Sequence, residues 1–340
     1  MTGSARNLAS LTAGLVAAVL LMLAPWAAMA SWLFAWVLWL VPAPLYAVGL
    51  VYGAQAAAAA GLIGIAVVAI APLAGGLAPA IAFAMLFSLP VAFLAFICLP
   101  QRAEPAPADA SSFAPRPDWQ RPDWQLPIGR ALALLTLFAA LIAILVFAAL
   151  ESQPGGYEAI LRRPLEHSME QLAQAGRSVS PEAVDAMVGQ LSRMFLAATA
   201  WVMIAVHAAC AAIAERFVAR RGLSLAAPVA WSLLAVPGWM VLPPVAAALA
   251  TLVATGPAAL LAINLFLILV FPWFLQGLAV LHVLLRGATG RKAILFLFYG
   301  LALPVLIVPI GALMVGLGLV DHWSGLRRRR LDGAPPREDL

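Results

Sequence analysis

Apolar residues fill most of the chain in nine long runs, separated by short polar segments. The runs cover residues 13–30, 32–52, 55–73, 78–99, 131–150, 194–214, 228–255, 258–286 and 293–320. A helix that crosses the hydrocarbon core of a bilayer needs about 20 apolar residues. The pattern therefore predicts an all-α fold, a polytopic transmembrane helical bundle with eight or nine spans.

Closely spaced prolines interrupt two of these runs, and a proline lacks the backbone N–H and breaks or kinks a helix. Pro42 and Pro44 interrupt the second run, and Pro237, Pro243 and Pro244 interrupt the seventh. Short or kinked helices are expected at both places, and either run could fail to cross the membrane completely.

The polar segments divide the chain into four regions. Residues 1–100 form an N-terminal four-span region, and residues 101–129 form a linker rich in Pro, Ala, Ser, Asp and Arg. Residues 130–320 form a C-terminal transmembrane region, and residues 321–340 form a basic polar tail. Such a polar linker is predicted to be flexible.

Residues 151–193 form the largest polar insert within the C-terminal region. Apolar residues recur at helical spacing from Tyr157 to Ala175, and Ser180-Pro181-Glu182 has the features of a helix start. The insert is predicted to be an amphipathic helical hairpin that lies on the outer surface of the membrane. Its second helix is expected to continue into the sixth run. A lid over a cavity is the sharper alternative.

The composition excludes a soluble domain, because 64% of the residues are hydrophobic and only 10% are charged. Basic residues flank the apolar runs, as expected for segments on the cytoplasmic side of a membrane. The lipid bilayer is therefore the predicted partner. No basic and aromatic interleaving typical of a nucleic-acid surface is present, so no nucleic acid is expected.

The orientation of the chain in the membrane is in conflict with its charges. With the amino terminus inside, nine spans would place the four arginines Arg327–Arg330 outside, although such a cluster favours the cytoplasm. Either one proline-broken run does not cross, or the tail breaks the rule. Ala28-Met29-Ala30 also resembles a signal-peptidase site, so cleavage after Ala30 is an alternative to a retained first span.

Three polar residues lie inside the eighth apolar run, before the arginine that ends it: Asn264, Gln276 and His282. A polar side chain in hydrocarbon is costly unless it finds a partner or lines a cavity. We interpret the three as candidate substrate-binding residues; the alternative is interhelical hydrogen bonds worth about 1 kcal/mol each. Asn264 and Gln276 are about 18 Å apart along a helix, too far to form one small site alone.

Small residues are spaced four apart in the third run, at Gly53, Ala57 and Gly61. Such a stripe lets two helices approach closely in lipid. It is a candidate docking face for a partner protein, and internal packing is the alternative.

Sequence motifs of common enzyme classes are missing. The chain has no Gly-Lys-Ser/Thr phosphate loop, no His-Glu-x-x-His, no Gly-x-Ser-x-Gly and no buried pair of carboxylates. His207 and Cys210 are three apart, but two ligands do not make a metal site. We therefore predict a protein that is not an enzyme and has neither a metal nor another cofactor.

Several motifs resemble those of one bacterial family. They are Pro44-Leu45-Tyr46, residues 49–53 (GLVYG), residues 275–282 (LQGLAVLH), Tyr299, and residues 316–323 (GLGLVDHW) before Arg327–Arg330. Together they resemble the DUF2232 (YybS-like) integral membrane protein family in its alphaproteobacterial form. The usual Leu-Pro start of that family is replaced here by Ala43-Pro44-Leu45.

The resemblance implies a multi-pass protein of the bacterial cytoplasmic membrane. The family is in turn similar to the substrate-binding S components of energy-coupling-factor transporters. That likeness implies a non-enzymatic binding or transport subunit that docks on another membrane protein or an ATPase coupling module, with Gly53, Ala57 and Gly61 as the docking face. A structural or assembly factor is the alternative function.

Overall fold

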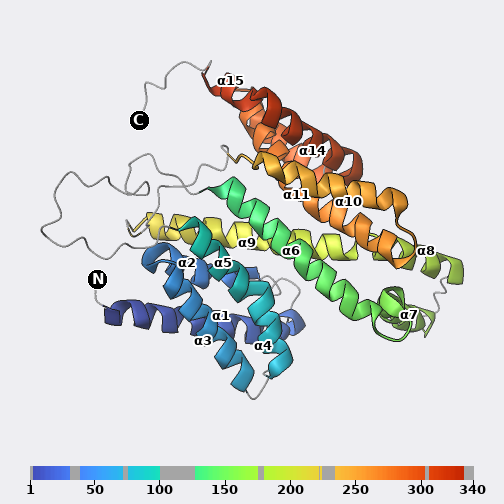
Figure 1. Cartoon of the computed structure of the whole chain (residues 1–340), viewed down its shortest axis with the longest axis horizontal. Helices are drawn as coiled ribbons and strands as arrows, with labels where there is room; N and C mark the ends of the chain where they lie inside the picture. The colour runs from blue at the N-terminus through green and yellow to red at the C-terminus, as the bar shows by residue number, and fades with distance from the viewer. Residues whose placement is uncertain are drawn as a thin grey trace, which may run out of the picture. The chain divides into compact units, whose positions relative to one another are not determined.

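The described residues of the computed structural model are 3–30, 39–71, 76–99, 127–174, 180–221, 223, 234–302 and 306–332, and they form helices and turns without any strand (Figure 1). They fall into two compact units, residues 1–135 with 203–229 and residues 136–202 with 230–340. The all-helical prediction is confirmed.

Unit 1 is built mostly from the N-terminal apolar runs. Its helices are α1 (Gly3–Ala30), α2 (Pro42–Tyr52), α3 (Ala54–Ile70), α4 (Leu77–Phe83), the π-helical turn η2 (Ala84–Ser88) and α5 (Leu89–Cys98), with the first turns of α6 (Ile128–Glu151) and the end of α9 (Phe195–Ala219). α4, η2 and α5 follow one another without interruption, so that residues 77–98 form one long helical segment.

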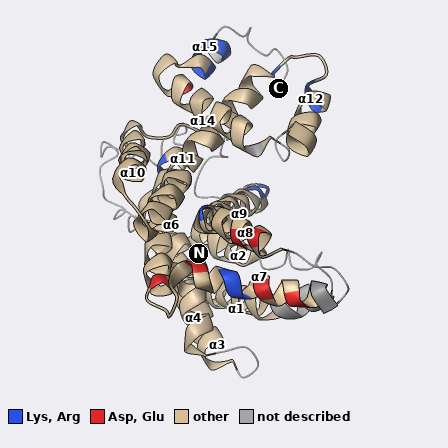
Figure 2. Cartoon of the chain, turned by 90° about the vertical axis from the view of Figure 1, so that its right-hand side faces the viewer, with Lys and Arg blue, Asp and Glu red and all other residues tan. Residues whose placement is uncertain are grey.

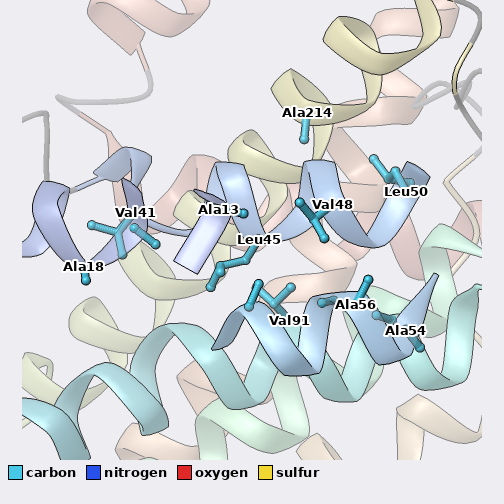
Figure 3. Close-up of a cluster of buried hydrophobic side chains, with 14 of the residues drawn as sticks. Ala13, Ala18, Val41, Leu45, Val48, Leu50, Ala54, Ala56, Val91 and Ala214 are labelled. Atoms are coloured by element: carbon cyan, nitrogen blue, oxygen red, sulfur yellow. The ribbon is translucent and has the colours of Figure 1, made fainter. Parts of the chain in front are cut away.

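Small side chains dominate the core of unit 1, which lets its helices approach closely (Figure 3). Ala17, Ala57 and Ala60 are almost completely buried. A Cβ added to Gly14 would collide with the carbonyl of Ala60, so α1 and α3 touch through their backbones.

Unit 2 contains the predicted insert and the C-terminal runs. Besides the rest of α6 and the start of α9, it has α7 (Gly156–Gln174), α8 (Pro181–Ser192), the 3₁₀ turn η5 (Gly238–Val241), α10 (Leu242–Val253), α11 (Pro257–Leu284), α12 (Arg291–Leu297), the π-helical turn η6 (Phe298–Ala302), α14 (Ile307–Ser324) and α15 (Leu326–Asp332). α11 and α14 lie side by side (Figures 1 and 2), and Gly277 and Gly318 face the other helix's backbone at their contact.

Five helical segments are long and apolar enough to cross a membrane: Ser4–Leu23, Leu77–Cys98, Ile128–Glu151, Phe195–Ala219 and Pro257–Leu284. The other apolar helices are shorter, at Pro42–Tyr52, Ala54–Ile70, Gly238–Val253 and Val308–Ser324. The chain is thus a multi-pass membrane protein by the length and composition of its helices.

The prolines act where the sequence predicts. α2 begins at Pro42, and α10 has Pro243 and Pro244 in its first turn, where their missing N–H groups are not needed. The ninth run differs from a single helix, because it is divided into α12, η6 and α14. Most of the predicted linker, residues 101–126, and residues 333–340 of the tail lie outside the described residues.

The boundary between the units differs from the boundary expected from the sequence. Residues 203–229, predicted within the C-terminal region, cluster with the N-terminal helices. Ala214 and Val218 of α9 belong to the core of unit 1, and His207 bonds to α2 and η2. Linker composition marks where the chain is polar, but these contacts decide which helices pack together.

Candidate functional site

Asn264 is completely buried in α11 and bridges the break between α8 and α9. Its Oδ1 accepts the N–H of Ala197 at 3.0 Å, and its Nδ2 donates to the carbonyls of Ser192 at 3.0 Å and Leu260 at 2.9 Å. In a continuous helix the N–H of Ala197 and the carbonyl of Ser192 would each form a backbone hydrogen bond with a residue four positions away. The amide of Asn264 therefore replaces two backbone hydrogen bonds that the break removes.

This break is a difference from the sequence analysis, which expected one helix from Ser180 into the sixth run. The predicted start at Ser180 is confirmed, because its Oγ accepts the N–H of Ala183 at 3.3 Å. The helix nevertheless ends at Ser192, and α9 starts at Phe195. Neither Pro nor Gly occurs at 193–194, so the sequence carries no local signal for the interruption.

Gln276 is also buried, at the contact of α11 with α14. Its Oε1 accepts the N–H of Val236 at 2.7 Å, and its Nε2 donates to the carbonyl of Gly318 at 3.0 Å and to Asp321 Oδ2 at 3.2 Å. Val236 belongs to a non-helical stretch before η5 and is itself 2% exposed. Non-helical backbone at membrane depth is tolerated only where protein groups satisfy it, and Gln276 does so here.

Asp321 extends the Gln276 network to α15. Its Oδ2 contacts Arg327 Nε at 2.9 Å and the same guanidinium's terminal nitrogen at 2.7 Å, and its Oδ1 accepts the N–H of Arg327 at 2.9 Å. Both side chains are at most a tenth exposed. Asp321 and Arg327 therefore form a buried ion pair.

His282, the third predicted binding residue, lies near the end of α11 and pairs with Tyr299 of η6. Its Nε2 and the Tyr299 hydroxyl are 2.8 Å apart. Asn264, Gln276 and His282 thus belong to three separate hydrogen-bonded groups, and no contact joins them in the described part of the chain. Their amide and imidazole groups form hydrogen bonds between elements of the protein. Such bonds were the predicted alternative to substrate binding.

A half-open pocket of about 390 Å³ lies where the hairpin leaves α6 and where α11 begins. It is lined by Glu151, Gly155, Gly156, Tyr157, Glu158, Gly256, Pro257 and Leu260. Leu260 connects the pocket to Asn264. Asn264 lies one turn further along α11 and donates a hydrogen bond to the Leu260 carbonyl. Asn264, a predicted substrate-binding residue, does not line this pocket, because it lies one turn beyond the lining residue Leu260.

Two carboxylates and a tyrosine give the pocket its polar groups. Glu151 Oε2 accepts the N–H of Tyr157 at 3.0 Å, and Glu158 Oε1 accepts the hydroxyl of Ser192 at 3.3 Å. Burial raises the pKa of Tyr157 to about 12, so its phenol keeps the proton that it donates to the carbonyl of Ser192. The Pro-Gly-Gly turn at 154–156 and an acid at the end of a span were signals for this site that sequence reasoning did not use.

The small-residue stripe of α3 packs inside unit 1. Ala57 is 1% exposed, and a Cβ on Gly61 would collide with the hydroxyl of Ser88 in η2. Gly53 has a φ of 89° and joins α2 to α3. These contacts correspond to internal packing, the alternative to a docking face.

Buried side chains also replace N–H groups that prolines lack. Pro90 has no proton for the carbonyl of Leu86, four residues earlier, and His207 Nε2 donates to that carbonyl at 2.8 Å. Because a carbonyl only accepts, the proton of His207 is on Nε2, and its Nδ1 accepts from the Tyr46 hydroxyl at 3.0 Å. The carbonyl of Met240, just before α10, likewise accepts a side-chain donor, the indole N–H of Trp273 at 3.3 Å.

Replacing His207 with Phe is expected to lower the free energy of unfolding by about 2 kcal/mol, because the Leu86 carbonyl and the Tyr46 hydroxyl lose their partner. In a Pro90→Ala background the restored N–H supplies one partner, so the same substitution should cost about 1 kcal/mol less. Unfolding of the four purified proteins in detergent, followed by circular dichroism, measures this coupling. Equal losses in both backgrounds would refute the role assigned to His207.

Comparison of the chain with models of protein families, with curated proteins and with solved structures finds no match. The likeness to the DUF2232 family and to S components stays a prediction from the sequence motifs.

Proposed function

We propose that this chain is a non-enzymatic, multi-pass protein of the bacterial cytoplasmic membrane that binds a small molecule in the pocket at the base of the α7–α8 hairpin. The pocket itself is the observation that carries the proposal. It has the size of a small-ligand site and joins polar groups with the apolar ring of Pro257 and side chain of Leu260.

The polar groups of the pocket favour a small organic cation. Glu151 and Glu158 each accept one hydrogen bond, which leaves lone pairs on both carboxylates. Within the described residues, neither forms an ion pair with Lys or Arg. A positively charged ligand would supply the missing partner and would be oriented by two carboxylates.

Asn264 would act in this site as a positioning residue. Asn264 does not line the pocket, but its amide bonds to the carbonyls of Leu260 and Ser192. Leu260 lines the pocket, and the Ser192 hydroxyl bonds to Glu158. Loss of its amide would displace the wall without removing a ligand contact.

Filling the pocket is expected to abolish binding. Leu260→Trp places an indole where the ligand would lie, and Glu158→Gln removes one charge and should weaken binding by about tenfold to a hundredfold. Native mass spectrometry of protein purified from membranes would detect the retained small molecule. Titration with choline, spermidine and thiamine then tests the cation class.

The control for Glu158 lies on the same helix, and the control for Leu260 lies on the neighbouring helix α10. Leu252→Trp changes a lipid-exposed leucine of α10, and Glu170→Gln removes an exposed acid of α7 outside the pocket. Both should bind like the original protein. Retention of the ligand by Leu260→Trp, or equal losses in the controls, would reject the pocket.

A structural or assembly factor is the second candidate function. It is favoured by the way in which Asn264 and Gln276 use their amides on backbone groups. Recovery of the protein from membranes with envelope proteins and without any small molecule would support it. Recovery of an ATPase coupling module would support the transport reading instead.

The membrane topology that we propose has eight spans and a returning ninth run. It is supported by Figure 2, where the basic residues of α12 and α15 lie at the same end of unit 2, so the chain leaves and re-enters that end between them. With runs one to eight as spans and the amino terminus inside, the linker, Arg216–Arg221, Arg286 and the tail all face the cytoplasm. The hairpin and its pocket then face outside, and the charge conflict of the sequence disappears.

A further inference from the structure

α15 presents three arginines that the protein itself does not use. The network around Asp321 occupies Arg327, whose side chain is one tenth exposed. The following residues, Arg328, Arg329 and Arg330, are exposed and have no ion-pair partner among the described residues. Since Asp321 is neutralised by Arg327, the surface of α15 carries a net positive charge.

The position of α15 relative to the apolar helices limits what these arginines can reach. α14 ends just before Gly325, which has a left-handed φ of 64°, and α15 follows directly. The backbone N–H of Arg327 in α15 donates to the carboxylate of Asp321 in α14. Trp323, beside this turn, is 70% exposed, and Leu313 on the same helix is 67% exposed. Exposed apolar side chains on a membrane helix face lipid, and Trp prefers the boundary between hydrocarbon and headgroups.

Other basic residues gather at the same end of unit 2. Arg286 and Lys292 are exposed at the end of α11 and the start of α12, and Figure 2 shows the basic residues of α12 and α15 at this end. The acidic residues of α7 and α8 lie at the opposite end. A one-sided basic surface at headgroup depth is complementary to anionic lipids.

We propose that Arg328, Arg329 and Arg330, with Trp323 as the interfacial anchor, form a binding surface for anionic phospholipid headgroups of the cytoplasmic leaflet. The planar guanidinium donates two parallel hydrogen bonds to phosphate oxygens, which suits this chemistry better than an ammonium group. This goes beyond ligand binding in the pocket and rests on the proposed topology only for the choice of leaflet.

The test is a titration of the full chain in mild non-ionic detergent with phosphatidylglycerol and with phosphatidylcholine of the same acyl chains, read by native mass spectrometry. Each arginine near an anionic surface contributes about a fivefold gain in affinity. The triple variant Arg328→Gln/Arg329→Gln/Arg330→Gln should therefore bind phosphatidylglycerol about a hundredfold more weakly. Binding of phosphatidylcholine should not change.

The matched control removes three charges from the hairpin, as Arg162→Gln/Arg163→Gln/Arg193→Gln, and should leave the phosphatidylglycerol affinity unchanged. Equal losses in both triple variants, or no loss in the α15 variant, would overturn the proposal. Displacement of the lipid by excess inorganic phosphate would indicate a site for free anions instead.

A second measurement tests the leaflet. With Cys98 and Cys210 buried, a cysteine introduced by Arg329→Cys should react with an impermeant maleimide only after cells are opened, whereas Ser168→Cys on α7 should react in intact cells. Labelling of Arg329→Cys in intact cells would refute the cytoplasmic assignment while leaving the lipid titration to be judged by itself.

Discussion

Gly318→Ala is expected to lower the free energy of unfolding by about 3 kcal/mol, because a methyl group there has no room. The added Cβ would collide with the carbonyl of Trp273 and approach the backbone nitrogen of Gly277 to 3.0 Å. Backbone atoms cannot rotate away as the end of a side chain does, so α11 and α14 would have to separate. Thermal unfolding of the purified protein in detergent measures the loss.

The same helix offers a matched control in Gly316→Ala. A Cβ at Gly316 meets no atom within 4 Å, so only the higher helix propensity of alanine remains. This variant should be as stable as the original protein or slightly more stable. If the two alanine variants were equally stable, α11 and α14 would not pack as closely as the contact of Gly318 with Trp273 requires.

Arg327→Met is expected to destabilise unit 2 by about 3 to 5 kcal/mol, since it leaves the carboxylate of Asp321 buried without its cation. Asp321 is 5% exposed and, among the described residues, keeps the amide of Gln276 and the Arg327 backbone N–H as partners. Unfolding in detergent, followed by circular dichroism, tests this value. Arg328→Met, at the next and exposed position, should change stability by no more than about 0.5 kcal/mol.

Removing both charges should restore most of the loss. In the double variant Asp321→Asn/Arg327→Met, the amide of residue 321 still accepts from Gln276 or from the backbone, and no unpaired charge is buried. A double variant less stable than Arg327→Met alone would show that the ion pair itself, and not the buried charge left behind, determines stability.

Sequence reasoning located the polar residues of the eighth run but not their partners. Asn264 and Gln276 were recognisable because an amide in an apolar helix must be satisfied. Their partners are backbone groups of Ala197, Ser192 and Val236, which are distant in sequence and identical in type to every other backbone group. No local pattern predicts which of them will be left free.

Some helix boundaries could be predicted from local sequence signals, and others depend on residues that are distant in sequence. Prolines marked the starts of α2 and α10, because the loss of an N–H is a local property of the residue. The break after Ser192 instead involves a residue distant in sequence, because the amide of Asn264 donates to the Ser192 carbonyl. The pocket was missed because Glu151 and Glu158 come together with Leu260 only when the start of α11 packs against the hairpin.

The bond from His207 to the Leu86 carbonyl has a consequence for biogenesis. The two residues are 121 positions apart, and translation at about 5–20 residues per second separates their synthesis by roughly 6–24 s. During that interval the segment 77–98 enters the membrane while the histidine that completes it has not yet been made. Unit 1 therefore cannot close during synthesis of its own N-terminal helices, and its assembly waits until α9 has left the ribosome.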